Sequence, residues 1–319
     1  MPTTSELHVV LGASGGTGGA VVRELARRGH RVRAVSRRGN ADAPAGVEHL
    51  AADVATAEGA KAACAGAAVV YHCAQPPYTR WPQEFPPLTD AVAAGAADAG
   101  AKLVLADNLY AYGPHEGPLT EDLPAAATGR KGRVRALMAE RLLAAHRQGQ
   151  GRLRVAIGRS SDYYGPGGLL SVAGERVFRA ALAGGTVRWL GRLDQPHTLS
   201  YLEDMAVGLV VLGERDEADG QVWHLPAAEP LTGRQFLELV VAATGGNSRI
   251  ATSSASTIRL AGVFVPFLRE LGETLPNFQA PYVLDWSRFR GAFGPNTPTP
   301  HAEAVARTVA WFRDHARTG

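Results

Sequence analysis

A glycine-rich loop near the N-terminus constrains the fold of this chain more than any other feature. The loop, Gly12-Ala13-Ser14-Gly15-Gly16-Thr17-Gly18, follows an apolar run and precedes a helical pattern that continues to Leu25. Glycines let the backbone turn tightly and approach phosphate oxygens, and the free N–H groups at the start of a helix favour an anion. This order of strand, loop and helix predicts a site for a dinucleotide pyrophosphate, held by Gly12, Ser14, Gly15, Thr17 and Gly18.

Short β-branched runs alternate with helical patterns through the first half of the chain. The runs cover residues 9–11, 32–35, 68–71, 103–105 and 153–157. Such alternation predicts an α/β fold of the Rossmann type, with a doubly wound parallel sheet and helices on both faces. Ligands of these sheets bind at the carboxyl ends of the strands, so functional side chains are expected directly after the strands.

After about residue 165 the alternation gives way to Pro and Gly clusters at 164–168 and 293–298. A strand at 222–225 and helices near 233–243 and 301–315 are expected in this second part. We therefore expect a dinucleotide-binding domain and a smaller, interleaved substrate lobe. The domain would comprise residues 1–165 and 200–225, and the lobe residues 166–199 and 226–319.

The charge balance and the cysteines exclude several classes of protein. The chain has 33 basic and 30 acidic residues, a net charge of +3 that is too small and dispersed to indicate nucleic acid or an anionic membrane. Cys64 and Cys73 lack the spacing of metal ligands and are too few for a disulfide framework, so we expect buried thiols, no metal and a reducing cytoplasm. The sequence shows no signal peptide and no apolar run long enough for a membrane span.

The end of the second expected strand carries no acidic residue. An acid there would bind the ribose hydroxyls of the adenosine and repel a 2′-phosphate, but the chain reads Ser36-Arg37-Arg38. Two guanidinium groups can form charge-assisted hydrogen bonds with a phosphate. This pattern favours NADP(H), with Arg37 and Arg38 as ligands, over NAD(H). The alternative is that both arginines are solvated turn residues.

Further segments resemble the extended short-chain dehydrogenase/reductases of the epimerase and dehydratase type. The resemblance extends to about residue 245 and rests on 52–54, 73–75, 107–114, 118–122, 139–143, 159–167, 200–204 and 222–225. It implies that Asp53, Cys73 and Ala74 line the adenine and the nicotinamide ribose, and Asn108 is a further candidate contact of the cofactor. Ser160 and Ser161, after the sixth strand, would hold the nicotinamide amide or else cap the following turn.

The chain departs from this family at the proton-transfer residues. The family uses a Tyr four residues before a Lys, with a Ser or Thr after the fifth strand, but the corresponding positions are Gly132, Ala136 and Asn108. Lysine occurs only at positions 61, 102 and 131, and the residues four before them are Ala57, Asp98 and Ala127. No Tyr-x-x-x-Lys motif exists in the chain. Loss of a positioned acid costs about 10² to 10⁴ in rate, so either another group replaces it or the chemistry is lost.

Three replacements for the missing proton donor stay open. One is a tyrosine, with Tyr110, Tyr112, Tyr163 and Tyr164 available. Another is His197, because histidine is the side-chain type that ordinarily exchanges a proton near neutral pH. The third is a phenol of the substrate itself, next to the ketone that is reduced. The candidate catalytic residues are therefore Asn108, Tyr112 and His197. The cations of segment 131–135 either stabilise developing charge or form a solvated helix start.

An aromatic, proline-rich segment follows the fourth strand and reads Gln75-Pro76-Pro77-Tyr78-Thr79-Arg80-Trp81. It suits a flat hydrophobic ligand, or else it is a packed loop. Candidate substrate contacts are Gln75, Tyr78, Trp81, Tyr110, His197 and Tyr201. The whole pattern resembles atypical extended reductases without the tyrosine, which include polyketide ketoreductases of actinomycete antibiotic pathways, of the angucyclinone ketoreductase type. This resemblance implies NADPH-dependent reduction of a ketone on a large aromatic polyketide.

Two other functions fit the same residues. One is a catalytically inactive protein that senses NADP(H) and contacts a regulatory partner, since such a protein also dispenses with the tyrosine. The other is a nucleotide-sugar epimerase or dehydratase, although those reactions rely on the missing acid/base pair. The sequence leaves the oligomeric state open between a monomer and a homodimer.

Overall fold

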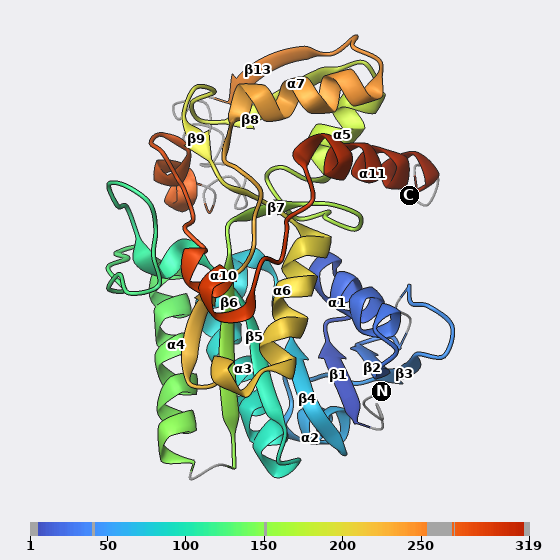
Figure 1. Cartoon of the computed structure of the whole chain (residues 1–319), viewed down its shortest axis with the longest axis vertical. Coiled ribbons are helices and arrows are strands. Elements are labelled where there is room, and N and C mark those ends of the chain that lie inside the picture. Colours follow the sequence, from blue (N-terminus) through green and yellow to red (C-terminus); the bar gives the residue numbers. More distant parts are fainter. Residues whose placement is uncertain (1–5, 40–41, 150–151, 254–269, 271, 316–319) are drawn as a thin grey trace.

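A seven-stranded parallel sheet forms the centre of the molecule, in the strand order β11-β6-β5-β4-β1-β2-β3 (Figure 1). The computed structural model describes residues 6–39, 42–149, 152–253, 270 and 272–315. The strand order reverses between β1 and β4, which creates the crevice where such sheets bind ligands. This sheet confirms the predicted Rossmann-type fold. Its strands are β1 (Leu7–Leu11), β2 (Arg31–Ser36), β3 (Glu48–Ala51), β4 (Ala67–His72), β5 (Lys102–Asn108), β6 (Arg154–Ser160) and β11 (Gln221–His224).

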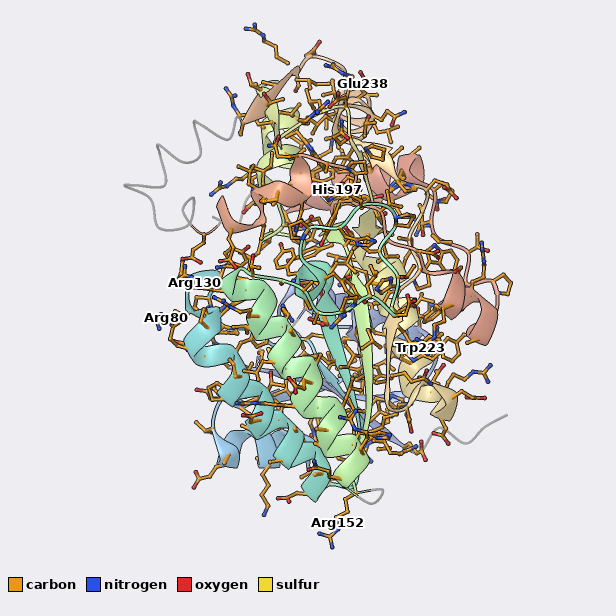
Figure 2. All side chains as sticks on the ribbon, turned by 90° about the vertical axis from the view of Figure 1, so that its left-hand side faces the viewer. Arg80, Arg130, Arg152, His197, Trp223 and Glu238 are labelled. Carbon is orange, nitrogen blue, oxygen red and sulfur yellow. The ribbon has the colours of Figure 1, made fainter. Side chains whose placement is uncertain are left out.

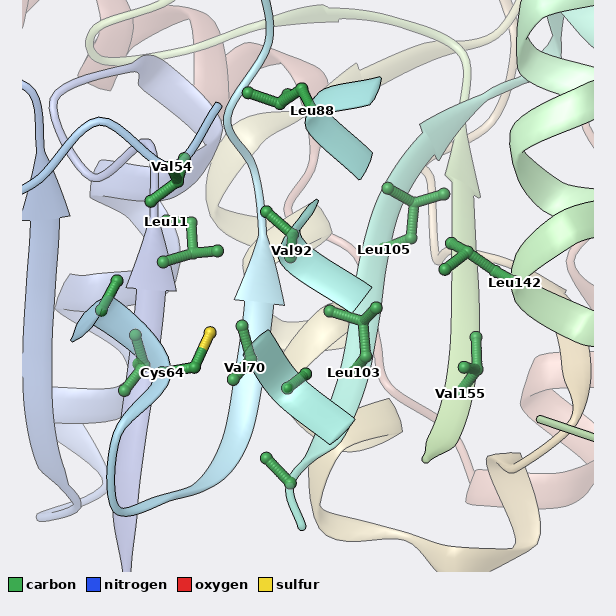
Figure 3. Close-up of a cluster of buried hydrophobic side chains, with 14 of the residues drawn as sticks. Leu11, Val54, Cys64, Val70, Leu88, Val92, Leu103, Leu105, Leu142 and Val155 are labelled. Atoms are coloured by element: carbon green, nitrogen blue, oxygen red, sulfur yellow. The ribbon is translucent and has the colours of Figure 1, made fainter. Parts of the chain in front are cut away.

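Helices cover both faces of this sheet. The first face packs against α2 (Ala57–Cys64), α3 (Trp81–Asp98) and α4 (Arg130–Gln148). Figure 3 shows the apolar side chains of this layer, including the buried thiol of Cys64. The second face packs against α1 (Gly16–Arg27), α6 (Leu202–Glu214) and α10 (Ser287–Phe293). Because every central strand is covered on both sides, its apolar residues run continuously instead of alternating.

A smaller lobe lies beyond the carboxyl ends of the strands (Figure 1). Its core contains Phe178, Trp189, Phe236 and Phe312, which are buried among α5, β8, α7 and α11. The elements of this lobe are β7 (Asp162–Tyr164), α5 (Glu175–Leu182), β8 (Thr186–Leu190), β9 (Pro196–His197), β10 (Leu199–Tyr201), β12 (Leu231–Thr232), α7 (Gly233–Thr244), β13 (Arg249–Ser253) and α11 (His301–Asp314).

The chain passes between the sheet and the small lobe more often than the expected domain boundaries imply. Helix α10 lies within 226–319, yet its Phe289 is buried in the core on the second face of the sheet. Segment 226–319 therefore supplies one helix to the sheet as well as most of the small lobe. The division into two domains at the expected residues stays a prediction.

Candidate functional site

The glycine loop turns sharply between β1 and α1. Gly12 has φ +80°, and a Cβ atom on it would lie 2.7 Å from the Cα atom of Ala74. A Cβ atom on Gly18 would overlap the carbonyl oxygen of Gly12. Helix α1 begins at Gly16 without a side-chain cap, which leaves the first N–H groups of the helix available to an anion. The loop therefore has the geometry of a pyrophosphate site.

Side chains at the end of β2 fit a phosphate-bearing ribose. The Ser36 side chain is buried, and its Oγ atom has no hydrogen-bond partner among the described residues. Arg37 and Arg38 are exposed, and neither forms an ion pair with a carboxylate in the described part of the chain. A buried polar atom without a partner is costly unless a ligand satisfies it. One unsatisfied hydroxyl and two unpaired cations are thus a suitable set of donors for a 2′-phosphate.

The other expected cofactor ligands also lie at the carboxyl edge of the sheet. Cys73 directly follows β4, where its amide donates to Leu11 (3.0 Å), and burial raises the pKa of its thiol to about 12. Ser160 ends β6 beside Asn108, and Ser161 has a buried Oγ atom without a partner among the described residues. Asp53 is exposed and accepts from the amide of Ala55 at 3.1 Å. The fold brings these residues to one edge, and their roles stay predictions.

The position expected for the catalytic tyrosine has no room for a side chain. Gly132 lies in the first turn of α4, and a Cβ atom there would overlap the carbonyl oxygen of Tyr110 and the Cβ atom of Ala127. Asn108 accepts from the amide of Tyr110 (3.1 Å), so its Oδ1 atom is engaged in holding the turn after β5. The packing around Gly132 therefore leaves no room for the tyrosine of the motif.

We expect Gly132→Ala to lower the free energy of unfolding by about 1 to 3 kcal/mol, because the added methyl group forces the backbone around Tyr110 to shift. Urea denaturation measures the change. Gly291→Ala in α10 is the matched control, since a Cβ atom there meets nothing within 4 Å and alanine favours a helix. Equal stability of the two variants would show that Gly132 is not sterically required.

Of the three cations of segment 131–135, Arg133 is exposed to solvent, whereas Lys131 and Arg135 are buried. Lys131 is buried and forms an ion pair with Glu270, and its amide donates to Glu273 at 2.5 Å. Arg135 is also buried, and its Nη1 atom lies 3.1 Å from Oδ1 of Asp107. Burial lowers the pKa of Arg135, and Asp107 opposes this effect. Each charge is therefore held by a carboxylate, Lys131 by Glu270 and Arg135 by Asp107.

Asp107 joins two buried guanidinium groups. Its Oδ2 atom lies 2.9 Å from Nε of Arg159, on β6, while its Oδ1 atom binds Arg135. The carboxylate side chain is fully buried. The Arg135 guanidinium also lies 4.3 Å from the ring centroid of Trp81 and 4.4 Å from that of Phe85. Sequence patterning gave no signal for this network, because its members come from two strands and a helix.

The aromatic segment after β4 is partly a packed loop and partly exposed. Trp81 begins α3 and is only 4% exposed, with its Nε1 atom donating to the carbonyl of Pro76 (3.3 Å). Tyr78 lies in a 3₁₀ helix (Tyr78–Arg80), is half-buried and packs edge-on against Trp81. Gln75 is exposed. Gln75 is therefore better placed for contact with a ligand than Trp81, and the hydroxyl group of Tyr78 is buried.

His197 lies where the small lobe meets the sheet (Figure 2). Its Nε2 atom is 2.9 Å from Oδ2 of Asp162, and the side chain is only 2% exposed. Phe278 stacks on the imidazole at 4.8 Å between centroids, and Tyr282 packs against it at 5.2 Å. Asp162, the first residue of β7, was missed by the sequence reasoning because it is remote from His197 along the chain.

Two further candidate tyrosines have buried surroundings. The Tyr112 hydroxyl lies 2.8 Å from Nε2 of His224, and the Arg159 guanidinium lies over its ring. Tyr201 is 3% exposed and packs against Tyr164 in the core of the small lobe. Their catalytic and substrate roles stay predictions.

Within the described residues, no group of His, Cys, Asp and Glu has the geometry to hold a metal ion. In the same part of the chain, no helix is long and apolar enough to cross a membrane.

Comparison with known proteins defines the class. Residues 8–225 match the model of the NAD dependent epimerase/dehydratase family. This match covers most of the chain, and the seven-stranded sheet is the fold expected for it. The chain belongs to the NAD dependent epimerase/dehydratase family. No curated protein sequence matches it significantly.

Solved structures share the whole fold at low sequence identity. MoeE5 in complex with UDP-glucose and NAD has a TM-score of 0.78 and 21% identity, covering 98% of this chain and 100% of that one. A dTDP-glucose 4,6-dehydratase, DesIV from Streptomyces venezuelae, has a TM-score of 0.76 and 19% identity, with 97% of each chain covered. The UDP-N-acetylglucosamine 4-epimerase from Bacillus cereus has a TM-score of 0.76 and 16% identity, again with 97% of each chain covered. At these identities the likeness establishes the fold alone.

Proposed function

We propose that this protein is an NADP(H)-dependent reductase that converts a ketone on a large, aromatic, polyketide-like substrate to an alcohol. The observation that carries the proposal is a dinucleotide site without the usual proton donor. The glycine loop is intact, while Gly132 leaves no space for the tyrosine of the motif. Ketone reduction needs one hydride and one proton, and the hydride is cofactor chemistry.

The residues present fit NADP(H) in particular. Gly12 and Gly18 permit close approach of the pyrophosphate, and Arg37, Arg38 and the unsatisfied Ser36 hydroxyl offer donors to a 2′-phosphate. Bound NADPH would supply the hydride for the substrate carbonyl. The protein would bind, orient and shield the substrate between the carboxyl edge of the sheet and the small lobe.

The half-buried aromatic side chains favour a flat substrate. Tyr78 and Tyr110 follow neighbouring strands, β4 and β5, and both residues are partly buried. Aromatic rings bury large area with few rotatable bonds, so they bind planar ligands at low entropic cost. The resemblance to tyrosine-less polyketide ketoreductases supports the same substrate class.

A nucleotide-sugar epimerase or dehydratase is the second candidate. It is supported by the family and by solved neighbours such as MoeE5, which is described with UDP-glucose and NAD. Those reactions also need an acid/base group, which would come from residues other than Gly132 and Ala136. An NADP(H)-sensing protein without turnover is the remaining alternative.

Stopped-flow fluorescence of NADPH distinguishes these functions. We expect the purified protein to bind NADPH more tightly than NADH and to oxidise it when aromatic ketones, including hydroxyanthraquinones, are added. Conversion of UDP-glucose or dTDP-glucose with retained cofactor would instead establish the second candidate. Tight NADPH binding with no turnover of ketones or nucleotide sugars would identify a sensor.

A further inference from the structure

Two buried arginines share a single carboxylate near the carboxyl edge of the sheet. Asp107 and Arg159 are paired in register, each as the last residue but one of its strand, β5 or β6. Arg135, from the first half of α4, binds the other oxygen of the same carboxylate. We call these three residues the arginine cluster. One arginine is sufficient to neutralise Asp107, so the cluster carries one positive charge in excess.

An excess charge is unfavourable in this position. A buried ion loses its solvation, which only a counter-charge and hydrogen bonds restore. The Nε atom of Arg135 is buried and has no hydrogen-bond partner among the described residues. The rings of Trp81 and Phe85 lie against Arg135, and the guanidinium group of Arg159 lies 4.7 Å from the centroid of the Tyr112 ring. These rings compensate part of the lost solvation but carry no negative charge.

Other carboxylates of the surrounding chain have partners of their own. The pairs are Asp162 with His197, Glu121 with the amide of His224, and Glu270 with Lys131. In the described part of the chain, Asp107 is the only carboxylate that forms an ion pair with Arg135 or Arg159. The excess positive charge therefore has no ion-pair partner among the residues that the structure describes.

Two buried histidines leave this charge unchanged. Burial lowers the pKa of His72 to about 3, and Arg135 acts in the same direction. Burial also lowers the pKa of His224 to about 4, with a contribution from Arg159. Both imidazoles are therefore neutral at pH 7, and neither adds to the charge of the cluster or offsets it.

The arginine cluster lies one residue short of the strand ends. Asn108 follows Asp107 as the last residue of β5 and is partly exposed, and Ser160 is its neighbour on β6. Ligands of such sheets bind just outside the carboxyl ends of the strands. A charge in surroundings of low dielectric constant acts over several ångström, so the arginines need no direct contact with a ligand to attract it.

We propose that the arginine cluster selects a negatively charged substrate, an aromatic ketone that carries an acidic group ionised at neutral pH. This inference rests on the proposed reductase function and narrows its substrate class. The ionised group of the substrate supplies the counter-charge that the protein lacks at this edge of the sheet. The second arginine thus serves substrate binding, while the first is sufficient to stabilise Asp107.

An anthraquinone carboxylate and its methyl ester test the preference, because they share the ring system and the ketone and differ in one charge. With saturating NADPH, we expect kcat/KM for the carboxylate to exceed that for the ester by about 10- to 100-fold. This is the effect of one unit charge at several ångström in a medium of intermediate dielectric constant. The Kd of both compounds for the protein loaded with NADP⁺, measured by quenching of tryptophan fluorescence, should show the same preference.

Arg159→Gln and Arg135→Gln each remove the excess charge and leave Asp107 paired with one arginine. We expect the preference for the carboxylate over the ester to fall by about tenfold or more in both variants. Two variants are used so that a folding defect in one of them does not prevent the test. Arg141→Gln is the matched control, because Arg141 is an exposed arginine of α4 that pairs with Asp90. Its preference should equal that of the wild type.

The outcomes separate the charge preference from the reductase function. Equal kcat/KM and equal Kd for the carboxylate and the ester would overturn the inference while the reductase function stands. A preference that persists in both glutamine variants would assign it to other residues and refute the role of the arginine cluster. If the wild type reduced neither compound, the reductase function would be refuted, and the two Kd values would still decide whether the site prefers an anion.

Discussion

Replacement of Asp107 by asparagine is expected to lower the free energy of unfolding by about 3 to 5 kcal/mol. Asparagine keeps the shape of the side chain but removes the only charge that Asp107 offers to Arg135 and Arg159. Both guanidinium groups are at least nine-tenths buried, at 5% and 6% side-chain exposure. Two buried cations would then lie close together with no carboxylate partner among the residues that the structure describes. Since domains are stable by only about 5 to 15 kcal/mol, this is a large fraction of the total.

Urea denaturation followed by circular dichroism measures this loss, provided that the m-value is unchanged. Asp90→Asn is the matched control. Asp90 also pairs with an arginine, Arg141, at 2.7 Å, but both side chains are about half exposed, at 53% and 48%. Exposed pairs contribute less than about 1 kcal/mol. If both substitutions had equally small effects, the buried network would not be the stabilising feature inferred here.

The double substitution Arg37→Ala and Arg38→Ala is expected to weaken NADPH binding by about 100-fold or more. Each charge-assisted hydrogen bond is worth about 1.5 to 3 kcal/mol, which corresponds to about 10- to 100-fold in Kd. Both arginines are exposed, so solvent screening places each near the lower end of this range. NADH lacks the 2′-phosphate, and its Kd should change by less than about threefold.

Fluorescence titration of both reduced cofactors checks this specificity. Arg152→Ala is the control for loss of a cation, because Arg152 lies at the end of the molecule away from the small lobe (Figure 2). The difference between NADPH and NADH should shrink as salt rises. Equal weakening for both cofactors would mean that the arginines bind the pyrophosphate or only support the fold.

Local sequence was sufficient to predict the parallel sheet and its glycine loop. The run before Gly12, the loop itself and the apolar face of α1 are contiguous, and each has the residue pattern of one element. The same holds for α7, which begins with a capping box between Thr232 and Gln235. The absence of the Tyr-x-x-x-Lys motif could also be recognised from the sequence, because the motif is defined only by the spacing of its tyrosine and lysine.

Contacts between residues that are distant along the chain could not be predicted from local sequence. The pair of His197 with Asp162 spans 35 residues, and the ion pair of Lys131 with Glu270 spans 139. The sequence left segment 131–135 open between a solvated helix start and a charged site. The structure buries Lys131 and Arg135, because α4 packs against α3 and Glu270, from the C-terminal part of the chain, pairs with Lys131.

By itself, the sequence determined the fold class, the position of the dinucleotide loop and the loss of the usual acid. These properties depend on the periodicity and spacing of neighbouring residues. Only the tertiary structure decided that Gly132 cannot carry a side chain, that Asp107 is shared by two buried arginines, and that the Lys131 ammonium group lies over the Tyr78 ring. The physical reason is that parallel strands bring their carboxyl ends to one edge, where residues distant along the chain become neighbours.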